Sequence, residues 1–304
     1  MADMKSKGTV GIVGLGIMGG AFAKNLVKAG WRVVGFDIDV RRSRALARLG
    51  VEIARDATDV AAEAPVIVTS LPSPGALLDT AKSIAAAKVR GRVVIEASTF
   101  AIRDKLKAEA VCAKAGHRML DCPVSGTGSQ AQVKDIIIYA SGDSAAIRRL
   151  QPLFKDFSRA VYDLGAFGNG SKMKYVANLL VAINNVASAE AMVLGLKAGL
   201  DPQVIHDMVV GGAANSRVFE LRAPMMVANR YDDATMKISV WQKDMSVIGD
   251  FAKSLRVRTP MFDASVPVYD KAMKSGHAMH DTAAVCAVLE KLAGVTRGKA
   301  RKHR

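Results

Sequence analysis

The first half of the chain alternates short runs of apolar, β-branched residues with longer segments of helical periodicity. Strands are predicted over residues 8–14, 31–37, 65–72, 92–99, 136–142 and 160–165. Helices are predicted over residues 18–30, 41–50 and 103–116. Because the strands are apolar on both faces, the alternation predicts an α/β fold with a doubly wound parallel sheet covered by helices on both sides.

The second half changes to helical periodicity and is rich in Ala, Leu, Met and Val. Residues 171–199 predict one helix of about eight turns that ends at Gly199. It is apolar nearly all round, so we expect most of its length to be buried. The predicted organisation is an α/β domain over residues 1–167 and an all-helical domain over residues 168–304, joined by the long helix.

A glycine-rich turn links the first predicted strand to the first predicted helix. Its sequence is Gly14-Leu15-Gly16-Ile17-Met18-Gly19, a G-x-G-x-x-G pattern, and a second strand ends in Asp37. In this context Gly14 makes the tight turn, Gly16 admits a pyrophosphate and Gly19 lets helix and strand pack closely. The helix N-terminus would bind the phosphates of a dinucleotide. The alternative is a glycine-rich turn without a ligand.

Asp37 bears on the choice between the two nicotinamide cofactors. A carboxylate accepts hydrogen bonds from the ribose hydroxyls and repels a 2′-phosphate, so Asp37 favours NAD. Arg41 and Arg42 follow closely and could bind that phosphate instead, or simply begin a solvated helix. We therefore predict NAD as the preferred cofactor, with NADP as the alternative.

Three further segments carry candidate chemistry. In "DCPVSGTGSQAQ", residues 121–132, the Ser125–Gly126 turn offers a hydroxyl and backbone N–H groups to an anion, or is an ordinary loop. In the long helix Lys174 and Asn178 share a face, whereas Lys172 points about 200° away from Lys174. The segment "WQKDM" contributes Lys243. Taken singly, each lysine also fits a surface residue whose stem packs on its helix.

Composition narrows the function classes. The chain has 50% hydrophobic and 5% aromatic residues, so base-stacking platforms for nucleic acid are not expected. Its net charge of +15 lies partly in the last eight residues, "RGKARKHR", a solvated or an interaction tail. The three cysteines indicate reduced thiols in a cytoplasmic protein. No uninterrupted apolar run approaches the ~18 residues of a membrane span, and the N-terminus has no apolar leader.

Together the motifs resemble the β-hydroxyacid dehydrogenases. "GIVGLGIMGG", "DCPVSGTG", "GNGSKMKYVAN" and "WQKDM" occur in that family's order and spacing, over roughly residues 8–293. The family includes 3-hydroxyisobutyrate dehydrogenase and tartronate semialdehyde reductase and is related to 6-phosphogluconate dehydrogenase. The resemblance implies an NAD(P)-binding Rossmann domain, an all-helical domain for substrate binding and oligomerisation, an active site in the cleft between them, and a homodimer or homotetramer.

The resemblance also implies roles for individual residues. Lys174 matches the catalytic lysine and Asn178 the active-site asparagine. Ser125, Gly126 and Thr127 match the turn that binds the substrate carboxylate, and Lys243 matches a lysine near the nicotinamide. Leu71 and Pro72 match a loop over the cofactor, and Ser98 and Thr99 a turn at its nicotinamide end.

The sequence departs from the family pattern at three places, and the first two bear on the substrate more than on the chemistry. Thr127 replaces the second glycine of an S-G-G turn, Lys134 replaces another glycine, and a proline is missing after Ser98-Thr99. A left-handed backbone at Thr127 would cost about 1 kcal/mol.

The resulting hypothesis is reversible hydride transfer between NAD(P) and a small acidic substrate, a β-hydroxyacid or semialdehyde. Lys174 would act as the general acid/base, its pKa lowered by burial, by the positive nicotinamide and by Lys243. One alternative is an imine reductase-like NADP enzyme, which Lys174 disfavours. Another is a non-catalytic NAD-binding module with a nucleic-acid-binding tail. A metal site at His277 and His280 is a third, although Asp281 could simply cap a helix.

Overall fold

A computed structural model describes residues 7–297 of the 304-residue chain. The chain divides into two compact units, residues 1–174 and 175–304, which are described separately. The expected division into functional domains after residue 167 stays a prediction. Most of the basic C-terminal tail, residues 298–304, lies outside the described residues.

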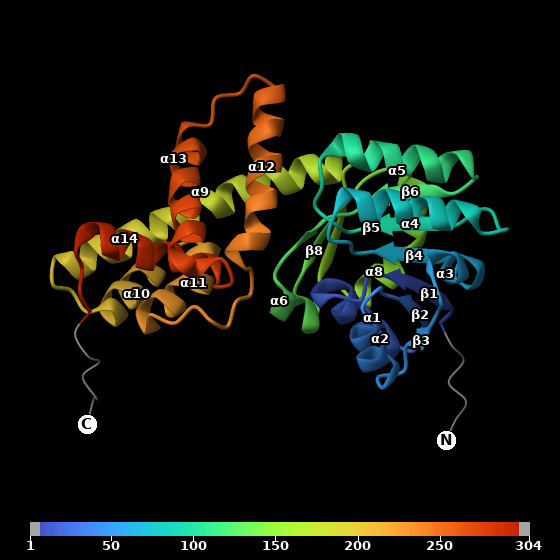
Figure 1. Cartoon of the computed structure of the whole chain (residues 1–304), viewed down its shortest axis with the longest axis horizontal. Coiled ribbons are helices and arrows are strands. Elements are labelled where there is room, and N and C mark those ends of the chain that lie inside the picture. Colours follow the sequence, from blue (N-terminus) through green and yellow to red (C-terminus); the bar gives the residue numbers. More distant parts are fainter. Residues whose placement is uncertain (1–6, 298–304) are drawn as a thin grey trace. The chain divides into compact units, whose positions relative to one another are not determined.

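The first unit is built on a six-stranded parallel sheet in the order β3-β2-β1-β4-β5-β6. Its strands are β1 (Thr9–Val13), β2 (Arg32–Phe36), β3 (Glu52–Ile53), β4 (Val66–Thr69), β5 (Val93–Glu96) and β6 (Arg118–Asp121). The connecting helices are α1 (Ile17–Lys28), α2 (Val40–Ala47), α3 (Ala57–Glu63), α4 (Pro74–Ala86) and α5 (Ile102–Lys114) (Figure 1). The order reverses between β1 and β4, so the predicted doubly wound fold is confirmed.

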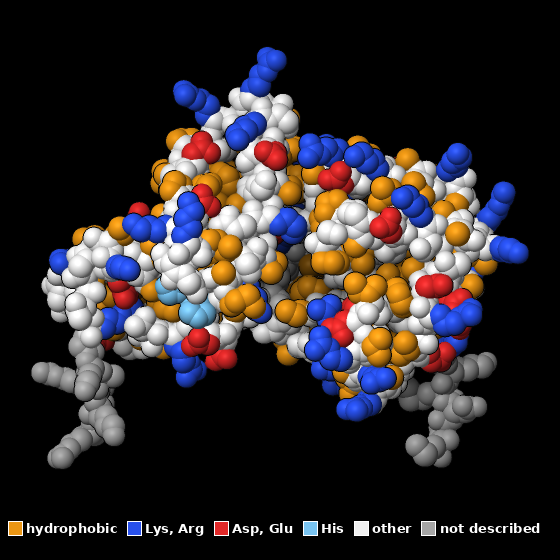
Figure 2. All heavy atoms as spheres, viewed as in Figure 1, with side chains coloured by type: hydrophobic (Ala, Val, Ile, Leu, Met, Phe, Trp, Pro, Cys, Tyr) orange, Lys and Arg blue, Asp and Glu red, His pale blue; other side chains and the backbone are white. Residues whose placement is uncertain are grey.

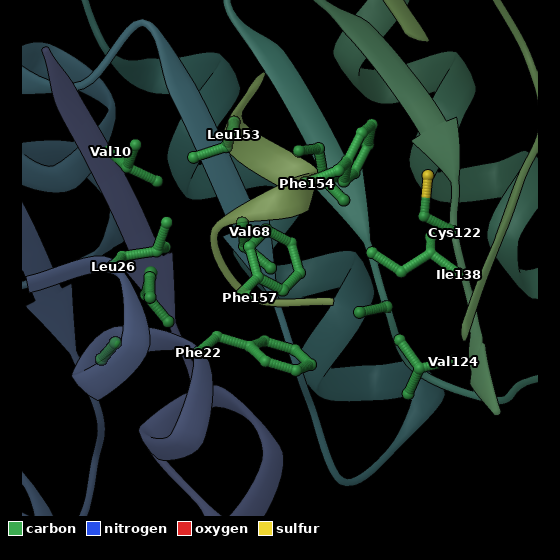
Figure 3. Packing of buried hydrophobic residues seen from close by; sticks show 14 of the residues in the cluster. Val10, Phe22, Leu26, Val68, Cys122, Val124, Ile138, Leu153, Phe154 and Phe157 are labelled. Atoms are coloured by element: carbon green, nitrogen blue, oxygen red, sulfur yellow. The ribbon is translucent and has the colours of Figure 1, made fainter. Parts of the chain in front are cut away.

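Neighbouring residues of these strands are buried on opposite faces of the sheet. Ile12 and Val68 belong to one core cluster, whereas Val13 and Ile67 belong to another. All four are at most 3% exposed, which is why the strands read as apolar at every position. In the first cluster Phe22 packs on Phe157 with ring centroids 4.9 Å apart (Figure 3).

The two later strands do not extend this sheet. They are β8 (Ile137–Ala140) and β9 (Ala160–Asp163), and with β7 (Val124–Ser125) they form a separate mixed sheet in the order β7-β8-β9. β7 runs antiparallel to β8, because the chain turns back after Asp121 and pairs it with Ser141. The short helices α6 (Gly128–Gln132), α7 (Ser144–Arg149) and α8 (Gln151–Lys155) connect these strands.

Apart from loops and an isolated bridge between Lys237 and Asp281, the described residues of the second unit form helices. The long helix α9 (Asn169–Lys197) begins in the first unit and confirms the helix predicted over residues 171–199. The others are α10 (Pro202–Val210), α11 (Arg217–Ala228), α12 (Ile238–Ser254), α13 (Pro260–Ala272) and α14 (Val285–Ala293), with the short segments η1 (Met273–His277) and η2 (Thr282–Ala284) before α14.

Helix α9 is less buried than its composition predicted. Val176, Leu180 and Leu194 are 52%, 53% and 73% exposed. The polar side of the helix packs inward instead: the Asn185 amide donates to the Tyr269 hydroxyl and to the Thr282 carbonyl, both at 2.9 Å. Composition alone could not tell which side of an all-apolar helix finds neighbours in its own chain.

Among the described helices, α9 alone is long and apolar enough to cross a membrane by length and composition. Its 29 residues contain an 18-residue window with a mean hydropathy of 1.6. The sequence expectation concerned apolar runs of about 18 residues, and polar residues such as Asn178 and Asn185 interrupt this helix. The mean hydropathy of the window is nevertheless high enough for a span. Its asparagines hydrogen-bond to other helices of the second unit, as expected for a core helix.

Candidate active site

The turns predicted to bind cofactor and substrate follow four neighbouring strands of the parallel sheet. Gly14 follows β1, Leu71 follows β4 and Ser98 follows β5, while β6 leads through residues 122–123 into β7, which ends in Ser125. The carboxyl ends of parallel strands lie at one edge, and β1 and β4 flank the point where strand order reverses. That edge is the usual ligand-binding position of a doubly wound sheet.

The glycine-rich turn has the close packing that the motif predicted. Gly14 has φ +90°, and a Cβ there would lie 2.1 Å from the Ser70 carbonyl oxygen. A Cβ on Gly19 would lie 1.9 Å from the Gly14 carbonyl oxygen, so only glycine lets α1 approach the turn. Gly16 is the N-cap of α1 and makes no side-chain cap, which leaves the helix N-terminus available to phosphate groups.

Asp37 is fixed beside this turn. Its side chain is nearly buried, and its two oxygens accept the backbone N–H groups of Leu15 and Asp39, each at 2.7 Å. A carboxylate has about four acceptor positions, so ribose hydroxyls can still bind. The Arg42 guanidinium lies 3.5 Å from Asp37 and also lies over Gly16, whereas Arg41 pairs with Asp39.

The loop after β4 and the turn after β5 are hydrogen-bonded to each other. The Leu71 N–H donates to the Ser98 hydroxyl at 2.9 Å, and the Ser98 N–H donates to Glu96 at 2.8 Å. Leu71 also lies beside the glycine-rich turn, since a Cβ on Gly14 would come within 3.3 Å of it. The structure thus brings Gly14, Leu71 and Ser98 together, as expected for residues around one cofactor.

The candidate substrate turn docks on the helix that follows the glycine-rich turn. Gly128 packs so closely on Ile17 that a Cβ would lie 2.2 Å from its side chain. About two turns further along α1, the Asn25 amide donates to the Ala131 carbonyl at 2.8 Å. Gly126 has φ +139°, and a Cβ there would lie 2.6 Å from Ile136, so this position requires glycine.

Thr127 does not carry the strain considered for it. Its φ is −97°, an ordinary extended conformation, and it caps α6. Its backbone N–H donates to the Gln130 side chain at 3.0 Å, and its hydroxyl accepts the Gln130 N–H at 3.5 Å. The strained position is Lys134, with φ +62°, where the family pattern has glycine. The cost of a left-handed backbone therefore belongs to Lys134.

The first turn of α9 is anchored on Asp121 at the end of β6, and Lys174 follows in the second turn. The N–H and hydroxyl of Ser171 donate to the two Asp121 oxygens at 2.7 and 2.8 Å. A Cβ on Gly170 would lie 2.2 Å from the Tyr139 carbonyl oxygen, so the helix start fits closely. Lys174 is partly buried, whereas Lys172 is exposed and donates to Asn169 at 3.0 Å.

Asp121 also belongs to a buried charge cluster that sequence reasoning missed. The Lys105 ammonium lies 2.6 Å from Glu96 and 2.7 Å from Asp121, and all three side chains are fully buried. Burial alone would lower the pKa of Lys105, but the two carboxylates outweigh it and hold that pKa above its usual range. A signal was present: Lys105 lies on the buried stripe of α5 with Ala108 and Cys112.

In the second unit, Asp244 joins Asn178 to Lys243. The Asn178 amide donates to Asp244 at 3.0 Å, and the Lys243 ammonium donates to it at 2.7 Å. Asn178 and Asp244 are nearly buried, whereas the Lys243 side chain is 36% exposed. Asp244 was not singled out in the sequence, although it follows Lys243 directly in the "WQKDM" segment.

The histidines considered as metal ligands lie near Asp281, which has other partners. His277 and His280 approach each other at 2.9 Å through their Nδ1 atoms. The Asp281 carboxylate caps η2 and accepts from Arg222 and Thr235. Within residues 7–297 no group of three or more side chains could hold a metal ion.

The basic surplus is spread over the surface. Figure 2 shows Lys and Arg side chains scattered over the visible face, among acidic and hydrophobic ones. Several are paired, such as Arg32 with Glu52 and Glu63, and Lys7 with Asp156. Arg297, the last described residue, pairs with Glu290.

Comparison with known sequence families covers both halves of the chain. Residues 9–165 match the family described as the NAD binding domain of 6-phosphogluconate dehydrogenase. Residues 168–289 match the family described as NAD-binding of NADP-dependent 3-hydroxyisobutyrate dehydrogenase. The two matched segments together contain all the candidate cofactor, substrate and catalytic residues.

Individual relatives match over nearly the whole chain. The L-threonate dehydrogenase of Escherichia coli O6:H1 is 31% identical over 92% of this chain and 94% of its own length. The 2-(hydroxymethyl)glutarate dehydrogenase of Eubacterium barkeri is 28% identical over 94% and 96%. The crystal structure of 3-hydroxyisobutyrate dehydrogenase from Salmonella typhimurium has a TM-score of 0.84 and 29% identity, over 92% and 99% of the two chains.

The solved imine reductases are more distant. The enzyme from Streptomyces aurantiacus is 18% identical with a TM-score of 0.59, over 92% of this chain and 99% of its own. This likeness shows a shared fold and nothing about the reaction.

Proposed function

Because the chain belongs to the β-hydroxyacid dehydrogenase family, and is thus an NAD(P)-dependent dehydrogenase acting on CH–OH groups, we propose that Lys174 is its general acid/base. The observation that carries this proposal is the anchoring of the first turn of α9. Ser171, three residues before Lys174, is held on buried Asp121 by two hydrogen bonds. Residues three apart on a helix are neighbours, so this anchor fixes the position of the Lys174 backbone.

The cofactor, when bound, accepts or supplies the hydride. In the oxidation direction Lys174 takes the proton of the substrate hydroxyl, and in the reduction direction it returns that proton to the carbonyl oxygen. A correctly placed general acid/base contributes roughly 10²- to 10⁴-fold to the rate. Asn178 is proposed to orient the hydroxyl, since its amide is itself held by Asp244. Lys243, bound to the same carboxylate, is proposed to lie near the nicotinamide and substrate.

The substrate carboxylate is proposed to bind the turn after β7. Ser125 and Gly126 would supply the donors, while the N–H of Thr127 is already donated to Gln130. Thr127 would therefore shape this end of the site more than it binds the carboxylate. An S-G-G turn would offer a third backbone N–H to the substrate carboxylate. This turn suits a substrate whose carboxylate binds without that third donor.

We propose NAD as the preferred cofactor. Gly14 through Gly19 would hold the pyrophosphate, with Leu15, Ile17 and Met18 lining it. Asp37 would bind the ribose, and its negative charge beside Leu15 disfavours a 2′-phosphate. Pro72 and Thr99 would complete the nicotinamide end with Leu71 and Ser98.

A cytoplasmic homodimer or homotetramer is the proposed form of the protein. The exposed apolar side chains of α9, among them Leu180 and Leu194, support self-association because apolar surface of this kind is commonly covered in oligomers. Neither a nucleic-acid partner nor a membrane partner is proposed: the basic side chains of the described residues are dispersed, and the asparagines of α9 hydrogen-bond within the second unit.

A substrate panel tests the proposal. Purified protein is assayed at the reduced-nicotinamide absorbance with 3-hydroxyisobutyrate, L-threonate, 2-(hydroxymethyl)glutarate and the matching semialdehydes, each with NAD and with NADP. We expect turnover with at least one β-hydroxyacid and a higher kcat/KM with NAD. Turnover of cyclic imines with NADPH, and of none of the hydroxyacids, would contradict the proposed reaction.

A further inference from the structure

The end of β5 and the end of β6 place two carboxylates side by side in the interior. Glu96 and Asp121 are paired residues of adjacent parallel strands, and both are fully buried. Two buried carboxylates at this spacing repel each other strongly unless a cation or a proton lies between them. Lys105 of α5 supplies that cation, 2.6 Å from Glu96 and 2.7 Å from Asp121.

Each carboxylate also holds a different functional segment. Glu96 accepts the Ser98 N–H at 2.8 Å, and the Ser98 hydroxyl accepts the Leu71 N–H at 2.9 Å, so this branch ends at the cofactor loop. Asp121 accepts the N–H and hydroxyl of Ser171, so the other branch ends at the first turn of α9.

Ser141 adds a second tie on the α9 branch. Its hydroxyl donates to Asp121 at 3.2 Å and accepts the Gly170 N–H at 2.9 Å. The N-terminal N–H groups of a 29-residue helix therefore point at the Asp121 side of the cluster, where the helix dipole favours a negative charge.

We propose that Lys105 is a positioning residue for hydride transfer, joining the loop at the nicotinamide end of the cofactor to the helix that carries Lys174. This inference rests on the proposed function of Lys174. Lys105 is fully buried, and its ammonium is paired with Glu96 and Asp121, so it acts by holding these two carboxylates together. A displacement of one branch against the other by about 1 Å would lower the rate by roughly 10²-fold.

Other titratable groups lie next to the cluster in sequence or on the helices α4 and α9. Cys122 follows Asp121, and burial raises the pKa of its thiol well above the usual value. From α4, the neighbour of α5, Asp79 and Lys82 are exposed and pair with each other. From α9, Lys172 is exposed, while Lys174 is the proposed catalytic group.

The test replaces Lys105 with methionine, which has a similar length and no charge. Glu96 and Asp121 then face each other directly, and one of them binds a proton with a raised pKa. Below that pKa the shared proton holds the two branches together; above it the carboxylates separate. We expect kcat of Lys105→Met to fall roughly 10²-fold at pH 8 and to recover about tenfold toward pH 6, relative to the wild type at each pH.

Two further variants separate positioning from simple destabilisation. Glu96→Gln/Lys105→Met removes the repelling pair, so the added pH dependence of kcat should disappear. Lys107→Met, an exposed lysine on the same helix, should retain the wild-type kcat at every pH.

Ser171→Ala gives an independent measurement should Lys105→Met not fold. It removes one hydroxyl at the α9 end, so we expect kcat to fall roughly tenfold while KM for the cofactor stays unchanged. A wild-type kcat in Ser171→Ala would overturn the inference.

The remaining outcomes are also decisive. If the wild type turns over a hydroxyacid but Lys105→Met matches Lys107→Met, only the positioning role fails. The same holds if the added pH dependence persists in the double variant. If the wild type turns over no member of the panel, the proposed function fails, and this inference fails with it.

Discussion

Replacing Asp244 with alanine removes the carboxylate that joins Asn178 to Lys243. Asn178 is 4% exposed and donates to Asp244 at 3.0 Å, so in the variant its amide is left buried without this acceptor. A buried hydrogen bond to a charged group contributes about 1.5–3 kcal/mol. The Lys243 side chain is 36% exposed and reaches water, so its pair with Asp244 adds at most about 1 kcal/mol.

Double-mutant cycles can measure how much more strongly Asp244 couples to Asn178 than to Lys243. The chain has two tryptophans, and one of them, Trp241, is buried on α12 three residues before Asp244. In a Trp31→Phe background, Trp241 fluorescence follows the urea unfolding of the second unit. We expect a coupling energy of about 1.5–3 kcal/mol between Asn178→Ala and Asp244→Ala, and below about 1 kcal/mol between Lys243→Met and Asp244→Ala.

Asp250→Ala is the matched control, since Asp250 is an exposed aspartate on the same helix. Its free energy of unfolding should lie within about 0.5 kcal/mol of the wild type. A coupling between Asn178 and Asp244 below about 0.5 kcal/mol would mean that the buried amide does not depend on this carboxylate.

Three other predictions follow from single residues. Lys134→Gly should raise the thermal midpoint, by a stabilisation of about 1 kcal/mol, because φ +62° suits glycine; Lys134→Ala should give no gain. Gly19→Ala should weaken NADH binding, measured by fluorescence, roughly tenfold or more, since its Cβ would overlap the Gly14 carbonyl; unchanged binding would contradict the packing seen here. Burial lowers the pKa of His117, so the unfolded chain binds a proton first as the pH falls below about 6.5. The thermal midpoint of the wild type should therefore fall more steeply between pH 7 and pH 5 than that of His117→Phe.

The sheet of the first unit could be predicted because its strands are apolar at every position. Val13 and Ile12 point to opposite faces and are both buried, and this two-sided burial leaves an uninterrupted apolar run in the sequence. The separate sheet of β7, β8 and β9 could not be predicted, because its pairing depends on the reversal between Asp121 and Ser141. Strand runs alone do not specify their partners.

Some parts of the candidate site have a local sequence pattern and could be predicted. The glycine-rich turn with Asp37 is one, and the capping box of Thr127 and Gln130, with its T-x-x-Q spacing, is another. The contacts of Lys105 with Glu96 and Asp121 depend instead on the register of two strands far apart in the sequence. The sequence indicates these contacts only through the position of Lys105 on the apolar stripe of its helix.

The decisive measurement for the proposed role of Lys174 is the kcat of Lys174→Ala on the best substrate of the panel, with Lys172→Ala as the matched control. Lys172 lies two residues away and is exposed, so its variant should turn over at nearly the wild-type rate. We predict that Lys174→Ala lowers kcat by roughly 10²- to 10⁴-fold at saturating substrate and that added small amines restore part of the loss. Near-wild-type turnover in Lys174→Ala would mean that Lys174 is not the general acid/base.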